Sequence, residues 1–214
     1  DPACGSGGFL VRATRRLIGR HAVKFGKATP KESLDIRKWP EVLSRLTPKE
    51  CEATIDGIAK HIHGFDINPF AVHISEMNLL FQVIDLYQKA RQGNSRFGLS
   101  RFQIYRTDSL ELPSSQTGLM SFQSPTGQSL AKDKAETDAL KKKKYDYVVG
   151  NPPYVRIQQI PEHVRATLAQ NFKTAKGLFD LYALFIELGM NLTQSQGKLG
   201  YIVSNKFLKA DYGK

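Results

Sequence analysis

A short apolar stretch, residues 145–150, runs directly into Asn151-Pro152-Pro153-Tyr154, and this junction restricts the local fold more than any other part of the sequence. Prolines cannot donate backbone hydrogen bonds, and each fixes its own φ near about −65°. The residue before each proline is driven into an extended conformation as well. The segment is therefore expected to be a stiff, non-helical loop at the carboxyl end of a strand, where open α/β sheets bind ligands. Such a loop can be a hydrogen-bonding clamp for a planar amine or simply a rigid turn.

Predicted strands and helices alternate along the rest of the chain. A glycine-rich turn opens a helix near residue 8, and a second helix is expected at about 48–59. Strands are expected to end at Asp66 and near Asp108, and another is introduced by Gly197 after an apolar helix at about 178–192. This order predicts an α/β fold with a doubly wound, mostly parallel sheet.

The helix after Asp66 has a clear start signal. Asn68 can cap it, and Pro69 suits its first turn. Five large apolar residues then recur on one stripe, and we expect this stripe to pack on the sheet: Phe70, Ile74, Met77, Phe81 and Ile84.

Two segments break the pattern and are predicted to be irregular insertions in a single domain that spans residues 1–214. Residues 26–50 are polar and interrupted by prolines, and residues 113–144 are rich in Ser, Gln, Thr and Lys. The second is expected to end in a loose helix. Its four final lysines, 141–144, fit a solvated face, with phosphate contact as the alternative.

Charge narrows the class of partner. The 31 Lys and Arg residues exceed the 20 Asp and Glu residues, which gives a net charge of +11 and favours an anionic partner, nucleic acid first. The two cysteines imply no disulfide framework and favour a reducing, intracellular setting. We find no signal peptide and no apolar run that could span a membrane. Because the chain begins without methionine, we expect a fragment of a longer protein. Its sheet is expected to be incomplete at both ends.

Three carboxylates are predicted to lie at successive strand ends. Asp1 heads a glycine-rich loop that is neither a P-loop nor a clean G-x-G-x-x-G, so a cation or hydroxyls suit it better than a phosphate. Asp66 can accept from both hydroxyls of a ribose, and Asp108 can accept from an exocyclic amine. Each could singly be a helix cap or a turn residue. Together they fit a nucleoside with a positive group, such as S-adenosylmethionine.

Five stretches together resemble the successive motifs of the amino-DNA methyltransferases that modify N6 of adenine. They are "DPACGSGGFL", "GFDINPFAVHISEMNLL", "RTDSLELP", "YDYVVGNPPYV" and "DLYALFIELGMNLTQSQGKLGYIVSN". The chain is most similar to the methyltransferase regions of type IIG restriction-modification enzymes and related phage-defence methylases. The resemblance implies a Rossmann-like catalytic domain that uses S-adenosylmethionine and acts on double-stranded DNA with a flipped adenine. It also implies a prokaryotic, cytoplasmic protein and a target-recognition region outside this sequence.

The resemblance also implies roles for individual residues. The methionine side of the cofactor would be lined by Asp1, Pro2, Ala3, Gly5 and Gly7. Asp66 would hold the ribose, with Ile67 against the cofactor's adenine. Asp108 would accept from the amine of that adenine, with Ser109 adjacent. The substrate base would be held by Asn151, Pro152, Pro153 and Tyr154.

The chemistry of the amine suits these residues. An adenine amino nitrogen is a poor nucleophile because its lone pair is delocalised. The Asn151 side-chain oxygen and the Pro152 carbonyl can accept its two hydrogens and favour a tetrahedral nitrogen, so that positioning and electrostatic stabilisation drive direct transfer. Tyr154 would stack on the flipped base. No metal is required.

Two alternatives remain open at this point. The same clamp could act on another planar group, such as a protein glutamine or an RNA base. Alternatively, the chain could be a DNA-binding or cofactor-binding piece without turnover.

Overall fold

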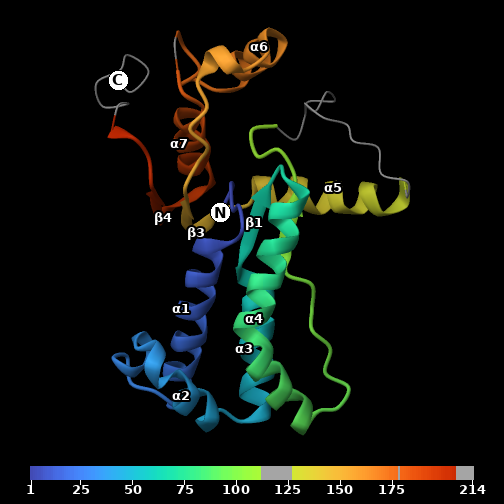
Figure 1. The fold of residues 1–214 in the computed structure, drawn as a ribbon, viewed down its shortest axis with the longest axis vertical. Coiled ribbons are helices and arrows are strands. Elements are labelled where there is room, and N and C mark those ends of the chain that lie inside the picture. Colours follow the sequence, from blue (N-terminus) through green and yellow to red (C-terminus); the bar gives the residue numbers. More distant parts are fainter. Residues whose placement is uncertain (112–126, 178, 206–214) are drawn as a thin grey trace. The chain divides into compact units, whose positions relative to one another are not determined.

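The computed structural model describes residues 1–111, 127–177 and 179–205 (Figure 1). They fall into two compact units. The helical unit comprises Cys4–Gly64 and Asn68–Ile104, and the strand-end unit comprises Asp1–Ala3, Phe65–Ile67 and Tyr105–Lys214. None of the helices within the described ranges is long and apolar enough to cross a membrane.

The elements alternate as the sequence predicts. The α-helices are α1 (Gly8–Lys24), α2 (Trp39–Arg45), α3 (Pro48–His61), α4 (Pro69–Gly93), α5 (Gly127–Lys142), α6 (Glu162–Asn171) and α7 (Leu181–Leu192). Short 3-10 turns are η1 (Glu32–Leu34), η2 (Ile36–Lys38) and η3 (Ile157–Gln159). The strands are β1 (His63–Asp66), β2 (Gln103–Arg106), β3 (Tyr145–Gly150) and β4 (Thr193–Tyr201).

The sheet prediction is confirmed in part. The chain is α/β, but its described strands form two pairs, β1 with β2 and β3 with β4, in place of one continuous sheet. The β3–β4 pair is parallel, with Val148 opposite Leu199. At the edge of β1, the Asp1 carbonyl accepts from the Phe65 N–H at 2.9 Å.

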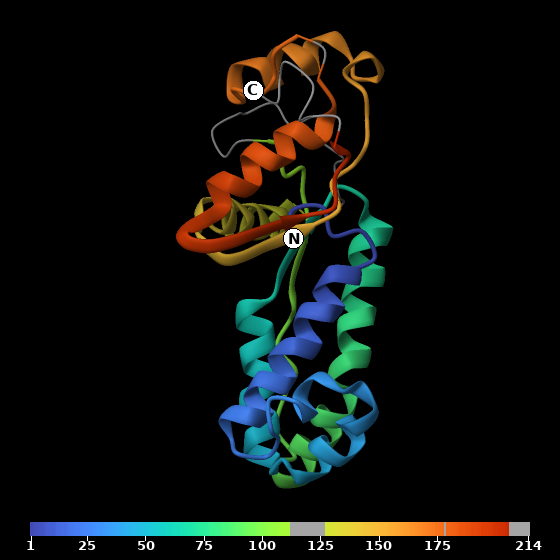
Figure 2. The ribbon, with the colours of Figure 1, turned by 90° about the vertical axis from the view of Figure 1, so that its left-hand side faces the viewer.

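The three longest helices of the helical unit pack together. Helices α1, α3 and α4 contact one another pairwise and run side by side (Figure 2). Their shared core is aliphatic and includes Leu10, Ile18, Ile55, Ile58 and Leu79. Gly7 permits a close approach, because a Cβ atom there would lie 2.4 Å from the Ser75 Oγ on α4.

Helix α4 begins at the predicted residue, but the face that it buries is not the predicted one. The Asn68 side chain accepts from the Phe70 N–H at 2.9 Å, and Pro69 occupies the first turn. However, the buried face consists of Val72, Ser75, Leu79, Val83, Leu86 and Ala90. The predicted packing residues, which we call the exposed stripe, face solvent: Phe70, Ile74, Met77, Phe81 and Ile84. The prediction that this stripe packs on the sheet is wrong, because α4 carries apolar residues on two faces and the spacing alone does not select the packed one.

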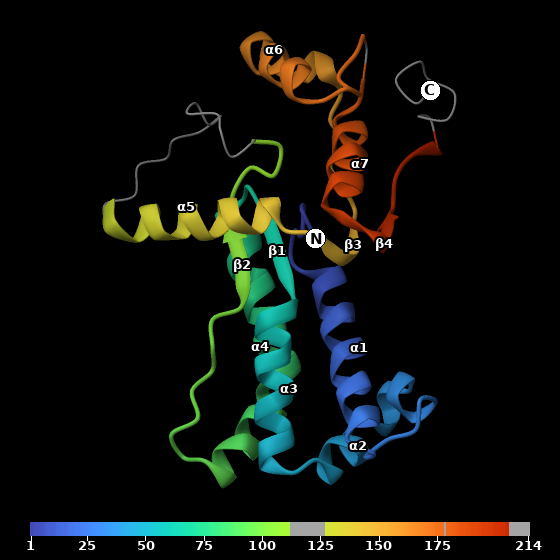
Figure 3. The same cartoon turned by 180° about the vertical axis from the view of Figure 1, so that it is seen from behind.

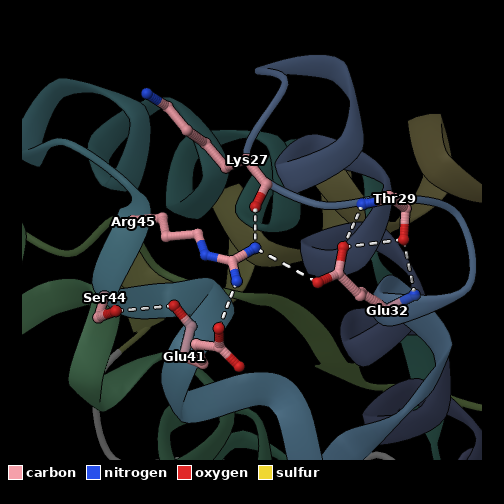
Figure 4. A network of polar contacts seen from close by, with 6 residues as sticks. All are labelled: Lys27, Thr29, Glu32, Glu41, Ser44 and Arg45. Atoms are coloured by element: carbon pink, nitrogen blue, oxygen red, sulfur yellow. Dashed lines mark hydrogen bonds and ion pairs between the residues drawn. The ribbon is translucent and has the colours of Figure 1, made fainter.

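Residues 26–50 are more regular than predicted. They hold η1, η2 and α2, and Val42 and Leu46 are buried against the helical core. A polar network ties the segment together (Figure 4). Arg45 donates to the Lys27 carbonyl at 3.2 Å and also bonds Glu32 and Glu41. The periodicity of this segment is hidden because its elements are only three to seven residues long.

The second predicted insertion, residues 113–144, lies outside the described residues up to residue 126. Its end is the expected helix, α5. Lys142, Lys143 and Lys144 are exposed, as a solvated face requires, but Lys141 is half-buried. The four lysines are therefore not one solvated face.

Strands β3 and β4 support the strand-end unit. Helix α7 packs against both, with Leu184 and Leu188 in the core that Val148 shares. Strand β4 begins at Thr193, earlier than the predicted Gly197. Glycine is needed at 197 because a Cβ atom there would lie 2.9 Å from the Tyr145 carbonyl oxygen.

Candidate functional site

Hydrogen bonds in the strand-end unit bring together the start of the chain and the carboxyl ends of β1 and β2. The Phe65 N–H donates to the Asp1 carbonyl at 2.9 Å, and the Thr107 N–H donates to the Asp66 carbonyl at 2.9 Å. The Ser109 hydroxyl donates to the Pro2 carbonyl at 2.5 Å. Asp1, Asp66 and Asp108 consequently lie on directly linked segments at one end of the strands.

Asp1 also lies next to the end of β3. A Cβ atom at Gly150 would be 2.7 Å from the Asp1 Oδ1, so only glycine fits there without a shift. The same oxygen accepts from the Ala3 N–H at 3.0 Å. The end of β3, and with it Asn151, therefore belongs to the same neighbourhood.

The carboxylates sit where the sequence predicts. Asp66 is the last residue of β1 and Asp108 follows β2 by two residues, and both are half-buried. Ile67 beside Asp66 is 52% exposed, which presents an apolar surface next to a carboxylate.

Ser109 is more deeply buried than its neighbour Asp108. It is 6% exposed, and its hydroxyl is used by the Pro2 carbonyl. The Oδ1 of Asp108 accepts from the Leu110 N–H at 2.9 Å. Ser109 thus links the loop after β2 to the start of the chain. The Asp108 carboxylate uses its Oδ1 within its own turn.

The Asn151-Pro152-Pro153-Tyr154 loop follows β3 directly and is non-helical, as predicted. Asn151 and Tyr154 are exposed and Pro152 is buried. Backbone pairing holds the chain just after the loop, because the Leu181 N–H donates to the Val155 carbonyl at 2.8 Å. The prolines and this pairing together keep the loop rigid.

Tyr154 is oriented by contacts that the sequence did not reveal. Its ring lies 5.8 Å from the ring of Tyr182 in the first turn of α7, at an interplanar angle of 50°. Its hydroxyl donates to the Ile202 carbonyl at 2.9 Å. Tyr182 is 1% exposed and provides a fixed surface. Both contacts join distant parts of the chain, so no local pattern predicts them.

Two predicted ligands, Gly5 and Gly7, belong to the helical unit. Both have positive φ, 53° and 84°, and Gly7 precedes the first turn of α1. Their glycine identity is explained by this left-handed backbone. Cys4 is buried in the core of the helical unit, where it packs among apolar side chains.

Searches among known proteins match the chain to one family model, Eco57I restriction-modification methylase, over residues 60–214. The type II restriction enzyme and methyltransferase RM.Eco57I of Escherichia coli is 26% identical over 228 aligned residues, which cover 100% of this chain and 20% of the relative. The adenine-specific methyltransferase PglX of Streptomyces coelicolor is 27% identical over 233 aligned residues, covering 100% of this chain and 17% of the relative.

A shorter match is closer in sequence. The type II methyltransferase M.BstVI of Geobacillus stearothermophilus is 42% identical over 71 residues, covering 33% of this chain and 13% of the relative. The chain thus spans a fifth or less of the length of these three relatives. The family model covers well over half of the chain, and its match includes β1, β2, β3 and the Asn-Pro-Pro-Tyr loop. The chain therefore belongs to the Eco57I restriction-modification methylase family.

Proposed function

We propose that this chain is the catalytic part of an enzyme that transfers a methyl group from S-adenosylmethionine to N6 of adenine in DNA, within a restriction-modification or phage-defence system. The observation that carries the proposal is the rigid Asn151–Tyr154 loop at the end of β3, beside Asp1. Family membership supports methyl transfer, and the adenine-specific PglX supports the target base.

The strand-end unit fits a nucleoside cofactor. Two half-buried carboxylates lie at the carboxyl ends of neighbouring strands, Asp66 as the last residue of β1 and Asp108 two residues after β2. The exposed Ile67 lies beside Asp66. We assign the ribose hydroxyls to Asp66, one face of the purine to Ile67 and the purine amine to Asp108. Asp1, Pro2 and Ala3 would face the methionine part. When bound, S-adenosylmethionine supplies an electrophilic methyl group on a sulfonium.

The Asn151–Tyr154 loop would bind the amino group of the substrate adenine. The Asn151 side-chain oxygen and the Pro152 carbonyl would each accept one amine hydrogen. These two bonds favour a tetrahedral nitrogen whose lone pair points at the methyl group. Because the prolines hold both acceptors in place before the base arrives, little reorganisation is needed during transfer.

Tyr154 would hold the base itself. Its ring is 53% exposed, so it offers a stacking surface to an adenine turned out of the duplex. Tyr182 and the Ile202 carbonyl hold this ring in one orientation.

Double-stranded DNA is the proposed partner, met in the cytoplasm of a prokaryotic cell. A net charge of +11 favours contact with phosphates and makes the affinity depend on salt. We place the reading of the target sequence in a region outside this chain.

Two substitutions test the proposal and separate binding from chemistry. Asp66→Ala removes the ribose acceptor, so cofactor affinity should fall by about 2–4 kcal/mol. Asn151→Ala removes one amine acceptor, so methyl transfer should collapse while cofactor affinity stays nearly constant. Calorimetry gives the first quantity, and single-turnover methylation of duplex DNA gives the second.

Matched controls come from exposed residues elsewhere. Asp85→Ala on α4 and Asn191→Ala on α7 remove the same groups away from the site, and both should leave binding and transfer unchanged. If Asn151→Ala stays folded, binds cofactor and methylates at the unmutated rate, the clamp mechanism is wrong. If Asn151→Ala instead lowers only the melting temperature, the loop is a structural turn.

A further inference from the structure

Figure 3 shows the carboxyl-terminal end of α5 beside β1 and β2. Lys141 lies in the last turn of α5, and its side chain bonds the loop that carries Asp108. Its ammonium donates to the Asp108 carbonyl at 2.5 Å and to the Glu111 carbonyl at 3.1 Å. The side chain is half-buried, unlike its exposed neighbour Lys142. A lysine at the carboxyl end of a helix often bonds the carbonyls of its own helix. Lys141 instead bonds a loop about thirty residues away in the sequence.

The loop that Lys141 bonds is a tight turn. The Glu111 N–H donates to the Asp108 carbonyl at 3.2 Å, and the Leu110 N–H donates to the Asp108 Oδ1 at 2.9 Å. Lys141 joins the carbonyls at both ends of this turn. Fixing the backbone of Asp108 in this way also fixes the direction of its Cα–Cβ bond, and so the place of its carboxylate.

Lys141 is itself held in place. The Tyr105 hydroxyl on β2 bonds Glu136 at 3.0 Å, and the Tyr145 hydroxyl on β3 donates to the Leu140 carbonyl at 2.9 Å. These bonds anchor the last two turns of α5 to β2 and β3. The ammonium therefore reaches the turn from an anchored helix end.

The charges around Lys141 are consistent with this contact. Burial lowers the pKa of Lys141, and the negative charges of Glu111 and Asp108 oppose that shift. An ammonium bonded to carbonyls makes charge-assisted hydrogen bonds, which are stronger than neutral ones.

We infer that Lys141 is a positioning residue for cofactor recognition: by joining the Asp108 and Glu111 carbonyls it holds the Asp108 carboxylate where the amine of the cofactor's adenine is recognised. The inference rests on the proposed function, because it takes Asp108 as the acceptor of that amine. It assigns the discrimination of an adenine cofactor from other purines to a residue that does not touch the cofactor. The Asp108 Oδ1 is used by the turn, so the amine is assigned to Oδ2.

The test compares two cofactors on one variant. Lys141→Met keeps the length of the side chain and removes its charge and its donors. Binding of S-adenosylmethionine and of its deaminated counterpart, in which a carbonyl replaces the purine amine, is measured by calorimetry. The unmutated protein should prefer the amine form. The variant should lose about tenfold in affinity for it, which corresponds to about 1.4 kcal/mol, and bind the deaminated form as before.

Lys142→Met is the matched control, since it makes the same change on an exposed neighbour and should preserve the preference. A merely structural role for Lys141 would weaken both cofactors equally, and that result would overturn the inference. So would an unchanged preference in Lys141→Met. If the unmutated protein binds neither cofactor, the proposed function fails first.

A second variant keeps the inference testable if Lys141→Met does not fold. Lys141→Gln retains a neutral donor on a shorter side chain and is measured in the same way if Lys141→Met unfolds. It should show an intermediate preference for the amine form. If both variants unfold while Lys142→Met does not, Lys141 serves folding and the inference is rejected.

Discussion

The Tyr154 ring lies near that of Tyr182, and its hydroxyl donates to the Ile202 carbonyl. The ring and the hydroxyl can therefore be separated by mutation. Tyr154→Phe loses one hydrogen bond, so the free energy of unfolding should fall by about 0.5–1.5 kcal/mol. Much of the methyl transfer should remain because the ring is kept. Tyr154→Ala loses the stacking surface, which should weaken capture of the base by about 1–3 kcal/mol.

Urea denaturation and single-turnover methylation measure these two effects. Tyr147→Phe is the control, because Tyr147 is exposed on β3 and outside the loop. Tyr154→Phe and Tyr154→Ala losing activity equally would show that the hydroxyl, and not the ring, holds the base.

At the scale of single residues, the sequence predicted the non-helical loop at the end of β3, because the signal for it is local. Asn151 and the two prolines are adjacent in the chain, and the restrictions that proline imposes act on neighbours. The contacts of the Lys141 and Ser109 side chains could not be predicted. Each depends on a carbonyl at least thirty residues away, and one lysine in a run of four looks like the others.

At the scale of elements, the carboxylate of Glu32 stabilises the segment between α1 and α3. Hydrogen bonds to this carboxylate lower its pKa. Glu32 accepts from the Thr29 N–H and hydroxyl, each at 2.8 Å, and from Arg45 (Figure 4). The hydrogen bond from the Thr29 backbone is the main cause that lowers the pKa of Glu32 from 4.5 to about 2. Because the folded pKa lies below the unfolded one, Glu32 stabilises the fold above about pH 4.5, and this contribution is lost as the pH falls towards about 2.

Glu32→Gln tests this dependence. The variant should be less stable than the unmutated protein at about pH 6, and the difference should shrink on acidification through the window between the two pKa values. Urea midpoints across that range give the comparison. Glu52→Gln on α3 serves as the control for the loss of one negative charge. A stability difference that stays constant with pH would show that the ionised form of Glu32 is not what stabilises the segment.

Element ends were easier to predict than element faces. The cap of α4 by Asn68 was predicted because capping needs only a side chain and an N–H two residues apart. The packed face of α4 was not, because two apolar faces compete and only contacts with α1 and α3 select one. The same limit applies to the sheet, whose strand order depends on long-range pairing.

At the scale of the whole molecule, the exposed stripe on α4 holds most of the large apolar side chains that the described helical residues present to solvent. Phe70 is 75% exposed and Phe81 is 60% exposed. Contiguous apolar surface of this kind favours association. Phe81→Glu should therefore reduce self-association in sedimentation velocity, while the free energy of unfolding changes by about 0.5 kcal/mol or less.

Val83→Glu is the matched comparison, two residues away on the buried face of the same helix. It places an unpaired charge in the core and should cost about 3–5 kcal/mol in a urea titration. Equal destabilisation by the two substitutions would show that the stripe is packed after all, as the sequence pattern first indicated.

The exposed stripe has a consequence for the abundance of this protein in a cell. Chaperones and proteases continuously sort chains by the fraction that is unfolded, so a small change in that fraction alters abundance several-fold. An apolar surface that also draws copies together adds aggregation to the same competition. Substitutions along α4 should thus change how much protein a cell holds, while the proposed site in the strand-end unit of each folded molecule should stay unchanged.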